Sequence, residues 1–122
     1  MGGVTLMICQ TCRRVAGGPP ETEEPRPGAR LLGRLEAACL PDTVTIRPVA
    51  CLSACTRGCT IALSGGPKRW SYIYGDLDPD RHVEAILEGA ARYAASEDGR
   101  VPWRERPEIF RKQSIARLPP QD

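Results

Sequence analysis

The cysteines of this chain fall into two groups whose spacing suits the binding of a metal. Cys9 and Cys12 are separated by two residues, and Cys51, Cys55 and Cys59 follow one another at every fourth position. Thiolates are strong ligands for zinc and for iron–sulfur clusters, both of which are held by four protein ligands. Each group directly follows an apolar or β-branched run. We therefore predict that two strand ends bring Cys9, Cys12, Cys51 and Cys55 to one metal or cluster.

Spacing alone leaves zinc and a [2Fe–2S] cluster open. Zinc sites favour pairs of C-x2-C turns, and only Cys9 and Cys12 have that spacing. A [2Fe–2S] cluster has two irons, and each takes two protein sulfurs, so it tolerates the wider spacing of Cys51 and Cys55. A buried cysteine can also act as a small hydrophobe, which is the simplest interpretation of Cys39 on the apolar stripe of a helix.

A dithiol oxidoreductase is the third interpretation of Cys9 and Cys12. In such proteins a helix begins directly after the C-x-x-C motif and lowers the pKa of its first thiol. Here residues 13–28 are rich in Gly, Pro and Glu and predict an exposed loop, so the next helix begins only near Ala29. The missing helix terminus disfavours this interpretation.

Composition narrows the class of protein. A length of 122 residues predicts one domain, and six cysteines are too few for a disulfide scaffold. We expect no secretory signal at the N-terminus and no membrane span, since no apolar run approaches about 20 residues. A reducing cytoplasmic location follows, where grouped cysteines indicate metal ligands or reactive thiols.

Hydrophobic periodicity predicts the order of the elements. Residues 4–8, 43–49, 60–64 and 70–74 have the pattern of strands, and the last two resemble a hairpin across Gly65–Lys68. A helix is predicted from about Ala29 to Pro41, and another from Asp78 as N-cap and Pro79 as first helical residue to Gly99. Trp70, Tyr72 and Tyr74 alternate, so one sheet face is expected to be aromatic and to pack in the core. The order matches a thioredoxin-like α/β core, a mixed four-stranded sheet with two main helices.

The C-terminal residues differ from the rest of the chain. Residues 99–122 carry 6 Lys and Arg against 3 Asp and Glu, whereas residues 1–98 carry 11 against 12. This weakly basic charge is too small for a nucleic-acid-binding protein. The segment combines four prolines with large apolar residues such as Trp103 and Phe110. We predict a metal-binding domain over residues 1–98 and a basic Pro-rich extension over 99–122 that packs on the domain or on a partner.

Four motifs carry a resemblance to known proteins. The stretch Cys51–Cys55 resembles the cluster-binding loop of thioredoxin-like [2Fe–2S] ferredoxins and of the related small iron–sulfur subunit of bacterial NADH dehydrogenase. Nearly the whole chain resembles a bacterial family of small predicted metal-binding proteins, a domain of unknown function, in Cys9–Arg13, Cys51–Arg57, Trp70–Asp76 and Pro102–Pro107. The resemblance implies a thioredoxin-like fold, four cysteine ligands and electron transfer. In the ferredoxins the two N-terminal thiols lie further apart, so Cys59 is an alternative to Cys12 as a ligand.

These patterns together predict a metal-binding protein of the [2Fe–2S] ferredoxin type that transfers single electrons and is not a self-contained enzyme. Arg13, Arg14 and Arg57 lie beside the predicted ligands and would offset the negative charge of such a centre. The partner that we expect is a redox protein, and the sequence also allows a homodimer. Neither nucleic acid nor a membrane is expected. The alternative is a zinc or other metal-binding module for storage, delivery or structure.

Overall fold

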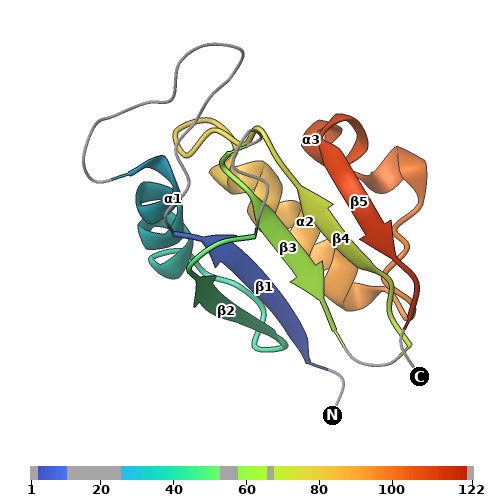
Figure 1. Cartoon of the computed structure of the whole chain (residues 1–122). Helices are drawn as coiled ribbons and strands as arrows, with labels where there is room; N and C mark the ends of the chain where they lie inside the picture. The colour runs from blue at the N-terminus through green and yellow to red at the C-terminus, as the bar shows by residue number, and fades with distance from the viewer. Residues whose placement is uncertain (1–2, 11–25, 53–57, 66–67, 121–122) are drawn as a thin grey trace.

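The described residues form a mixed five-stranded sheet with helices packed against it (Figure 1). The computed structural model describes residues 3–10, 26–52, 58–65 and 68–120. The strands, in the spatial order β2-β1-β3-β4-β5, are β1 (Val4–Cys9), β2 (Val44–Val49), β3 (Ile61–Ser64), β4 (Ser71–Tyr74) and β5 (Ser114–Leu118). The helices are α1 (Pro27–Glu36), α2 (Val83–Ala95), the 3-10 turn η2 (Trp103–Glu105) and α3 (Glu108–Lys112).

The predicted α/β class and its strand directions are confirmed. β1 runs parallel to β2 and antiparallel to β3, and β3 and β4 form the predicted antiparallel hairpin. The sheet has five strands and not four, because β5 pairs antiparallel with β4 at one edge. β2 forms the other edge, where Pro48, which has no N–H to donate, is tolerated.

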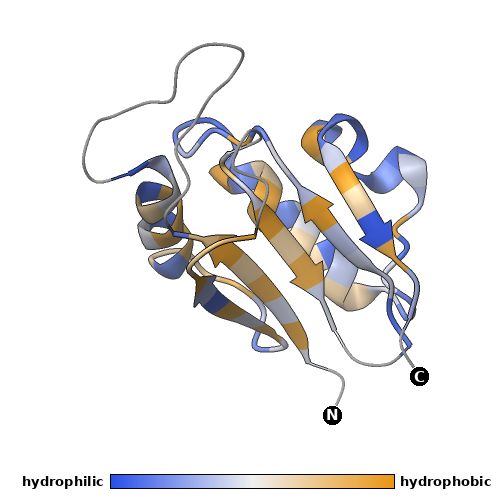
Figure 2. Ribbon diagram, viewed as in Figure 1, coloured by the Kyte–Doolittle hydropathy of each residue, from blue (hydrophilic) through white to orange (hydrophobic). Residues whose placement is uncertain are grey.

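The core lies between the sheet and helices α1 and α2. Leu6 and Ile8 of β1 and Ile61 and Leu63 of β3 are fully buried, because these two strands occupy the middle of the sheet. The most apolar strands are thus the central ones, as the colouring of Figure 2 shows. Helix α1 contributes Leu31 and Leu35, and α2 contributes mainly Ile86, Ala90 and Tyr93. In the part of the chain that the structure describes, no helix combines the length and apolarity that crossing a membrane requires.

Helix α1 ends earlier than its apolar stripe predicts. Its last residue is Glu36, and the N–H groups of Ala37 and Ala38 close the final turn on the carbonyl oxygens of Gly33 and Leu35. Cys39 therefore lies beyond the helix and is exposed, so its predicted place on a buried helical face was wrong. Pro41 disfavours helical φ and ψ angles at Leu40, the residue before it, so helix α1 has to end before this position.

Helix α2 begins at Val83 and not at Pro79, so the predicted N-cap was also wrong. The carboxylate of Asp78 accepts a hydrogen bond from the N–H of Asp80 at 2.8 Å, which closes a separate turn. The Nδ1 atom of His82 accepts a hydrogen bond from the N–H of Asp78, also at 2.8 Å. His82 itself takes the N-cap position. Local hydrogen bonds of Asp and His side chains thus compete with the first turn of a helix.

The C-terminal residues belong to the same hydrophobic core. Ile109 and Phe110 of α3 are 7% and 4% exposed, and the ring of Phe110 stacks on that of Tyr74 with centroids 4.3 Å apart. Tyr72 and Tyr74 are buried, as their alternation predicts, whereas Trp70 is only partly covered. The segment after Gly99 therefore adds a strand and core side chains to the sheet. Whether it also serves a partner stays a prediction.

Candidate metal centre

The parallel pairing of β1 and β2 brings Cys9 and Cys51 to the same end of the sheet, where both strands finish. Cys9 is the last residue of β1 and lies opposite Val49, the last residue of β2. The N–H of Gln10 donates to the carbonyl oxygen of Val49 at 3.0 Å, which extends the pairing by one residue. The thiol of Cys9 lies 3.7 Å from the carbonyl oxygen of Ala50, the residue before Cys51. The Cys9 thiol therefore lies beside the backbone that leads into Cys51, the first cysteine of the second group.

The two thiols differ in their exposure to solvent. Cys9 is 1% exposed and joins the hydrophobic core, whereas Cys51 is exposed. Leu52, the next residue, packs against the core and anchors the chain beside Cys51. A centre held by this pair would lie at the protein surface with one side against the core. Such a position suits a group that must be reached from outside yet is shielded from water on its inner side.

Cys59 lies at the same end of the sheet, just before β3. The N–H of Cys9 donates to the carbonyl oxygen of Thr60 at 3.2 Å, which places the end of β1 beside the start of β3. The backbone of Cys59 exchanges two hydrogen bonds with Leu77, of 3.4 and 3.1 Å. The peptide bond between Gly58 and Cys59 is cis. The side chain of Cys59 is 0% exposed and belongs to the core, as does that of Cys9, so burial does not distinguish a ligand from a small buried hydrophobe and Cys59 as a substitute ligand stays a prediction.

The other two predicted ligands, Cys12 and Cys55, lie outside the described residues, as do Arg13, Arg14 and Arg57. Within the described ranges no group of three or more His, Cys, Asp or Glu side chains is arranged to hold a metal ion. A four-thiolate centre at Cys9 and Cys51 therefore depends on these two residues. Cys39, which was not predicted as a ligand, is exposed and follows α1.

One group of side chains was not predicted from the sequence as a unit. Trp70 was assigned to the core, but its ring lies near the guanidinium groups of Arg100 and Arg117, with the guanidinium carbons 5.8 and 4.8 Å from the ring centroid. These residues come from three separate segments, so only the pairing of β5 with β4 reveals their proximity. The available signal was the five arginines of residues 99–122, which accompany Trp103.

The fold is shared with proteins of known structure. A thioredoxin-like [2Fe–2S] ferredoxin from Aquifex aeolicus aligns with a TM-score of 0.57 and 18% identity over 98% of this chain and 97% of the other. A second structure of the wild-type ferredoxin, at 1.5 Å resolution, gives a TM-score of 0.58 and 17% identity, and covers 95% of this chain and 99% of the other. The likeness establishes the thioredoxin-like fold, and since the identity is low it establishes the fold alone.

The family follows from the sequence itself. The pattern of the family described as protein of unknown function (DUF1636) matches residues 6–120. The chain therefore belongs to this family, which confirms the resemblance to a domain of unknown function related to the thioredoxin-like ferredoxins. No curated protein matches the chain.

Proposed function

We propose that this protein is a one-electron carrier that holds a [2Fe–2S] cluster through Cys9, Cys12, Cys51 and Cys55. The observation that supports it best is the placement of Cys9 and Cys51 at the same end of the sheet, within a fold that the ferredoxins share. A cluster of this type is held by four protein sulfurs, two on each iron, and supplies single-electron transfer when bound.

Covalent spacing makes the other two thiols available to the same centre. A residue adds at most about 3.6 Å to the reach of a chain, so Cys12 can lie no further than about 11 Å from Cys9, and Cys55 no further than about 14 Å from Cys51. Soft thiolate donors in this number suit iron–sulfur clusters and zinc, and not hard cations such as calcium. The donor set therefore fits the proposed group.

The residues of the chain would divide the work at this centre. Cys9, buried at the end of β1, would bind from the inner side, and its position is fixed by pairing with both neighbouring strands. Cys51, exposed after β2, would bind from the outer side and leave that side open to a redox partner protein. The core around Leu52 would exclude water from the inner side. We place this carrier in the reducing cytoplasm, in line with the use of its cysteines as thiolates.

The deciding experiment compares two predicted ligands, Cys51 and Cys55, with Cys39 as a control. The protein and its Cys51→Ala, Cys55→Ala and Cys39→Ala variants are purified without air, and iron, sulfide, zinc and the visible spectrum are measured. We expect about two irons and two sulfides per chain in the unmodified protein and in Cys39→Ala, and loss of both in Cys51→Ala and Cys55→Ala. Because Cys51 and Cys39 are both exposed, neither alanine is expected to disturb the core.

Each other outcome points elsewhere. Retention of the cluster in Cys51→Ala or Cys55→Ala would remove that residue from the ligand set. A colourless protein with one zinc per chain would contradict the electron carrier and support the alternative function, a zinc-binding module. Absence of both metals, together with reduction of a disulfide substrate, would support the dithiol oxidoreductase. In this structure α1 begins only at Pro27, well after Cys12 in the sequence, which does not favour that activity.

A further inference from the structure

A surface rich in arginine and tryptophan lies at the opposite end of β4 from the cysteines. We call it the Arg–Trp surface and define it by Trp70, Arg100, Trp103, Arg106 and Arg117. The guanidinium of Arg106 lies 5.5 Å from the ring centroid of Trp103 and 5.9 Å from that of Tyr72. Tyr72, which is buried, pairs with Arg117 across the β4–β5 ladder, so Arg106 and Arg117 lie on the same face of the sheet.

This surface carries the most exposed large apolar side chain of the described residues, since Trp103 is 58% exposed. Large apolar groups gathered at the surface and surrounded by polar ones mark sites of interaction. Tryptophan and arginine are also the residue types most enriched at the energetic centres of protein interfaces, where lysine is depleted. All basic residues of 99–122 except Lys112 are arginines.

The arginines are positioned by the rings and keep hydrogen-bond donors available. Arg117 and Arg104 form no ion pair with any residue in the described ranges, and Arg106 uses its Nε to donate to the carbonyl oxygen of Val101 at 2.7 Å. Arg100 pairs with Asp98, whose carboxylate it contacts at 2.9 Å. A guanidinium that stacks on an aromatic ring keeps its edge N–H groups for a carboxylate or phosphate. The surface is thus arranged to receive anions beside apolar groups.

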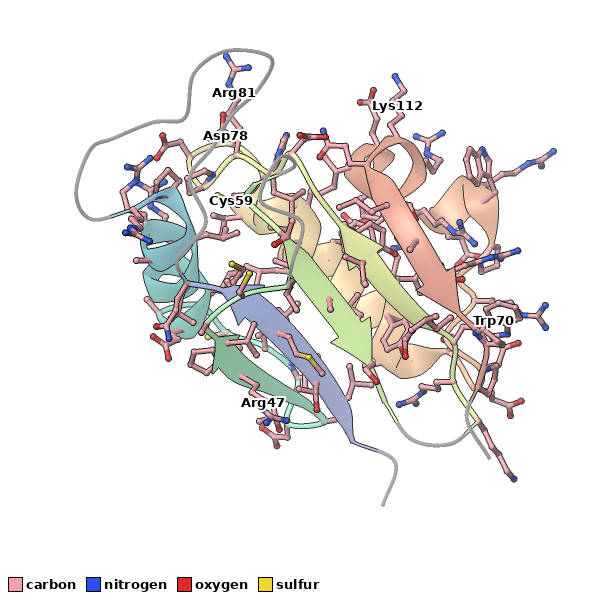
Figure 3. The ribbon with its side chains drawn as sticks, viewed as in Figure 1. Arg47, Cys59, Trp70, Asp78, Arg81 and Lys112 are labelled. Atoms are coloured by element: carbon pink, nitrogen blue, oxygen red, sulfur yellow. The ribbon has the colours of Figure 1, made fainter. Side chains whose placement is uncertain are left out.

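The location separates this surface from the metal centre. Trp70 precedes β4, whereas Tyr74 at the other end of β4 pairs with Ile61, close to Cys59. Figure 3 shows Trp70 and Cys59 at opposite ends of the sheet. A partner bound at the Arg–Trp surface would therefore leave the end of the sheet that carries Cys9 and Cys51 uncovered. The inference stands whether or not the cysteines bind a cluster.

We propose that the Arg–Trp surface binds an acidic segment of a partner protein, one in which carboxylates alternate with apolar side chains. The arginines match the carboxylates, and the rings of Trp103 and of the partly exposed Trp70 match the apolar side chains. A nucleic acid fits less well, because the surface has three arginines, of which Arg100 is already paired with Asp98, and binding a phosphate backbone takes an extended row of basic residues. The net charge of +2 is also low for binding nucleic acid.

The test uses intrinsic fluorescence, because both tryptophans of the chain lie in the proposed surface. A short peptide of alternating Glu and Leu is titrated into the full-length protein, and a peptide of alternating Gln and Leu serves as the comparison. We expect a fluorescence change with the Glu peptide alone, weakened by added salt. Arg117→Gln should weaken binding about tenfold, the loss of one charge-assisted contact. Arg47→Gln, which removes an exposed arginine from the other edge of the sheet, should leave binding unchanged (Figure 3).

Four results would overturn the proposal. The first is no response to the Glu peptide, and the second is equal binding of the Glu and Gln peptides. The third is equal weakening by Arg117→Gln and Arg47→Gln, which would indicate a nonspecific charge effect. Tighter binding of a single-stranded oligonucleotide than of the Glu peptide would reassign the surface to nucleic acid. The metal content of Arg117→Gln should equal that of the unmodified protein, so this test is independent of the one on the cysteines.

Discussion

Gly89 in helix α2 should tolerate no larger side chain, because α3 packs directly on it. A Cβ atom at Gly89 would overlap with the Cε2 and Cζ atoms of Phe110 and would lie 2.8 Å from its Cδ2 atom. The ring cannot easily move aside, since Phe110 is 4% exposed and stacks on Tyr74. Overpacking of a rigid core costs about 3 kcal/mol at its upper end, while alanine gains about 1 kcal/mol over glycine in a helix. We therefore expect Gly89→Ala to lower the free energy of unfolding by about 2 kcal/mol.

The chain offers a matched control in Gly33 of helix α1. Nothing lies within 4 Å of a Cβ atom built at Gly33. Gly33→Ala should therefore raise the free energy of unfolding by about 0.5–1 kcal/mol through helix propensity alone. For a chain of this length the two substitutions should shift the midpoint of thermal unfolding by about 8 °C downwards and about 3 °C upwards, respectively. Far-UV circular dichroism during thermal and urea unfolding measures both effects.

A double variant tests the contact itself. Phe110→Leu alone should destabilise, but in the Gly89→Ala background it removes the clash, so that the two effects differ from additivity by at least about 1 kcal/mol. If Gly89→Ala stabilised the protein as much as Gly33→Ala, α3 would not pack on α2 as described. Additive effects would lead to the same conclusion.

Two further predictions concern the residues around Trp70. Gly99 has a φ of 81°, and an added Cβ would lie 2.7 Å from Tyr93 Cε1, so Gly99→Ala should cost about 2–3 kcal/mol in urea unfolding; unchanged stability would contradict this geometry. Burial raises the pKa of Tyr93 to about 12, against the opposing effect of Arg69. The unfolded tyrosine loses its proton near pH 10, so stability should fall as pH rises from about 10 to about 12. Tyr93→Phe should flatten this decline, and an equally steep decline would exclude Tyr93 as its cause.

The described structure also changes how the C-terminal segment can be tested. Removal of residues 100–122 would delete β5 and the core side chains Val101, Ile109 and Phe110. A truncated protein would therefore lose stability for reasons unrelated to any partner. Point variants on the surface, such as Arg117→Gln, separate binding from folding because Arg117 is exposed at the edge of the sheet.

Local patterns predicted the elements whose residues are buried on a regular period. The strands around Leu6, Ile46, Leu63 and Tyr72 follow from β-branched and apolar alternation, and the structure contains each of them. β5 escaped prediction because the edge strand is mostly exposed and includes Arg117, so it has no apolar alternation to reveal it. The ends of α1 and α2 were misplaced because they depend on hydrogen bonds of single side chains and on the turn before Pro41.

The sequence by itself determined the chemistry that this protein can offer: six thiols in a fixed spacing, a net charge of only +2, and a strand and helix order that permits a thioredoxin-like sheet. These properties are local, since they depend on residue type and on distances of a few residues. Only the tertiary structure decided that Cys9 and Cys51 lie at the same end of the sheet. It also decided that the guanidinium groups of Arg100 and Arg117 both lie over the ring of Trp70. Such proximities arise from the register between strands far apart in the chain, which is set by the packing of the whole core.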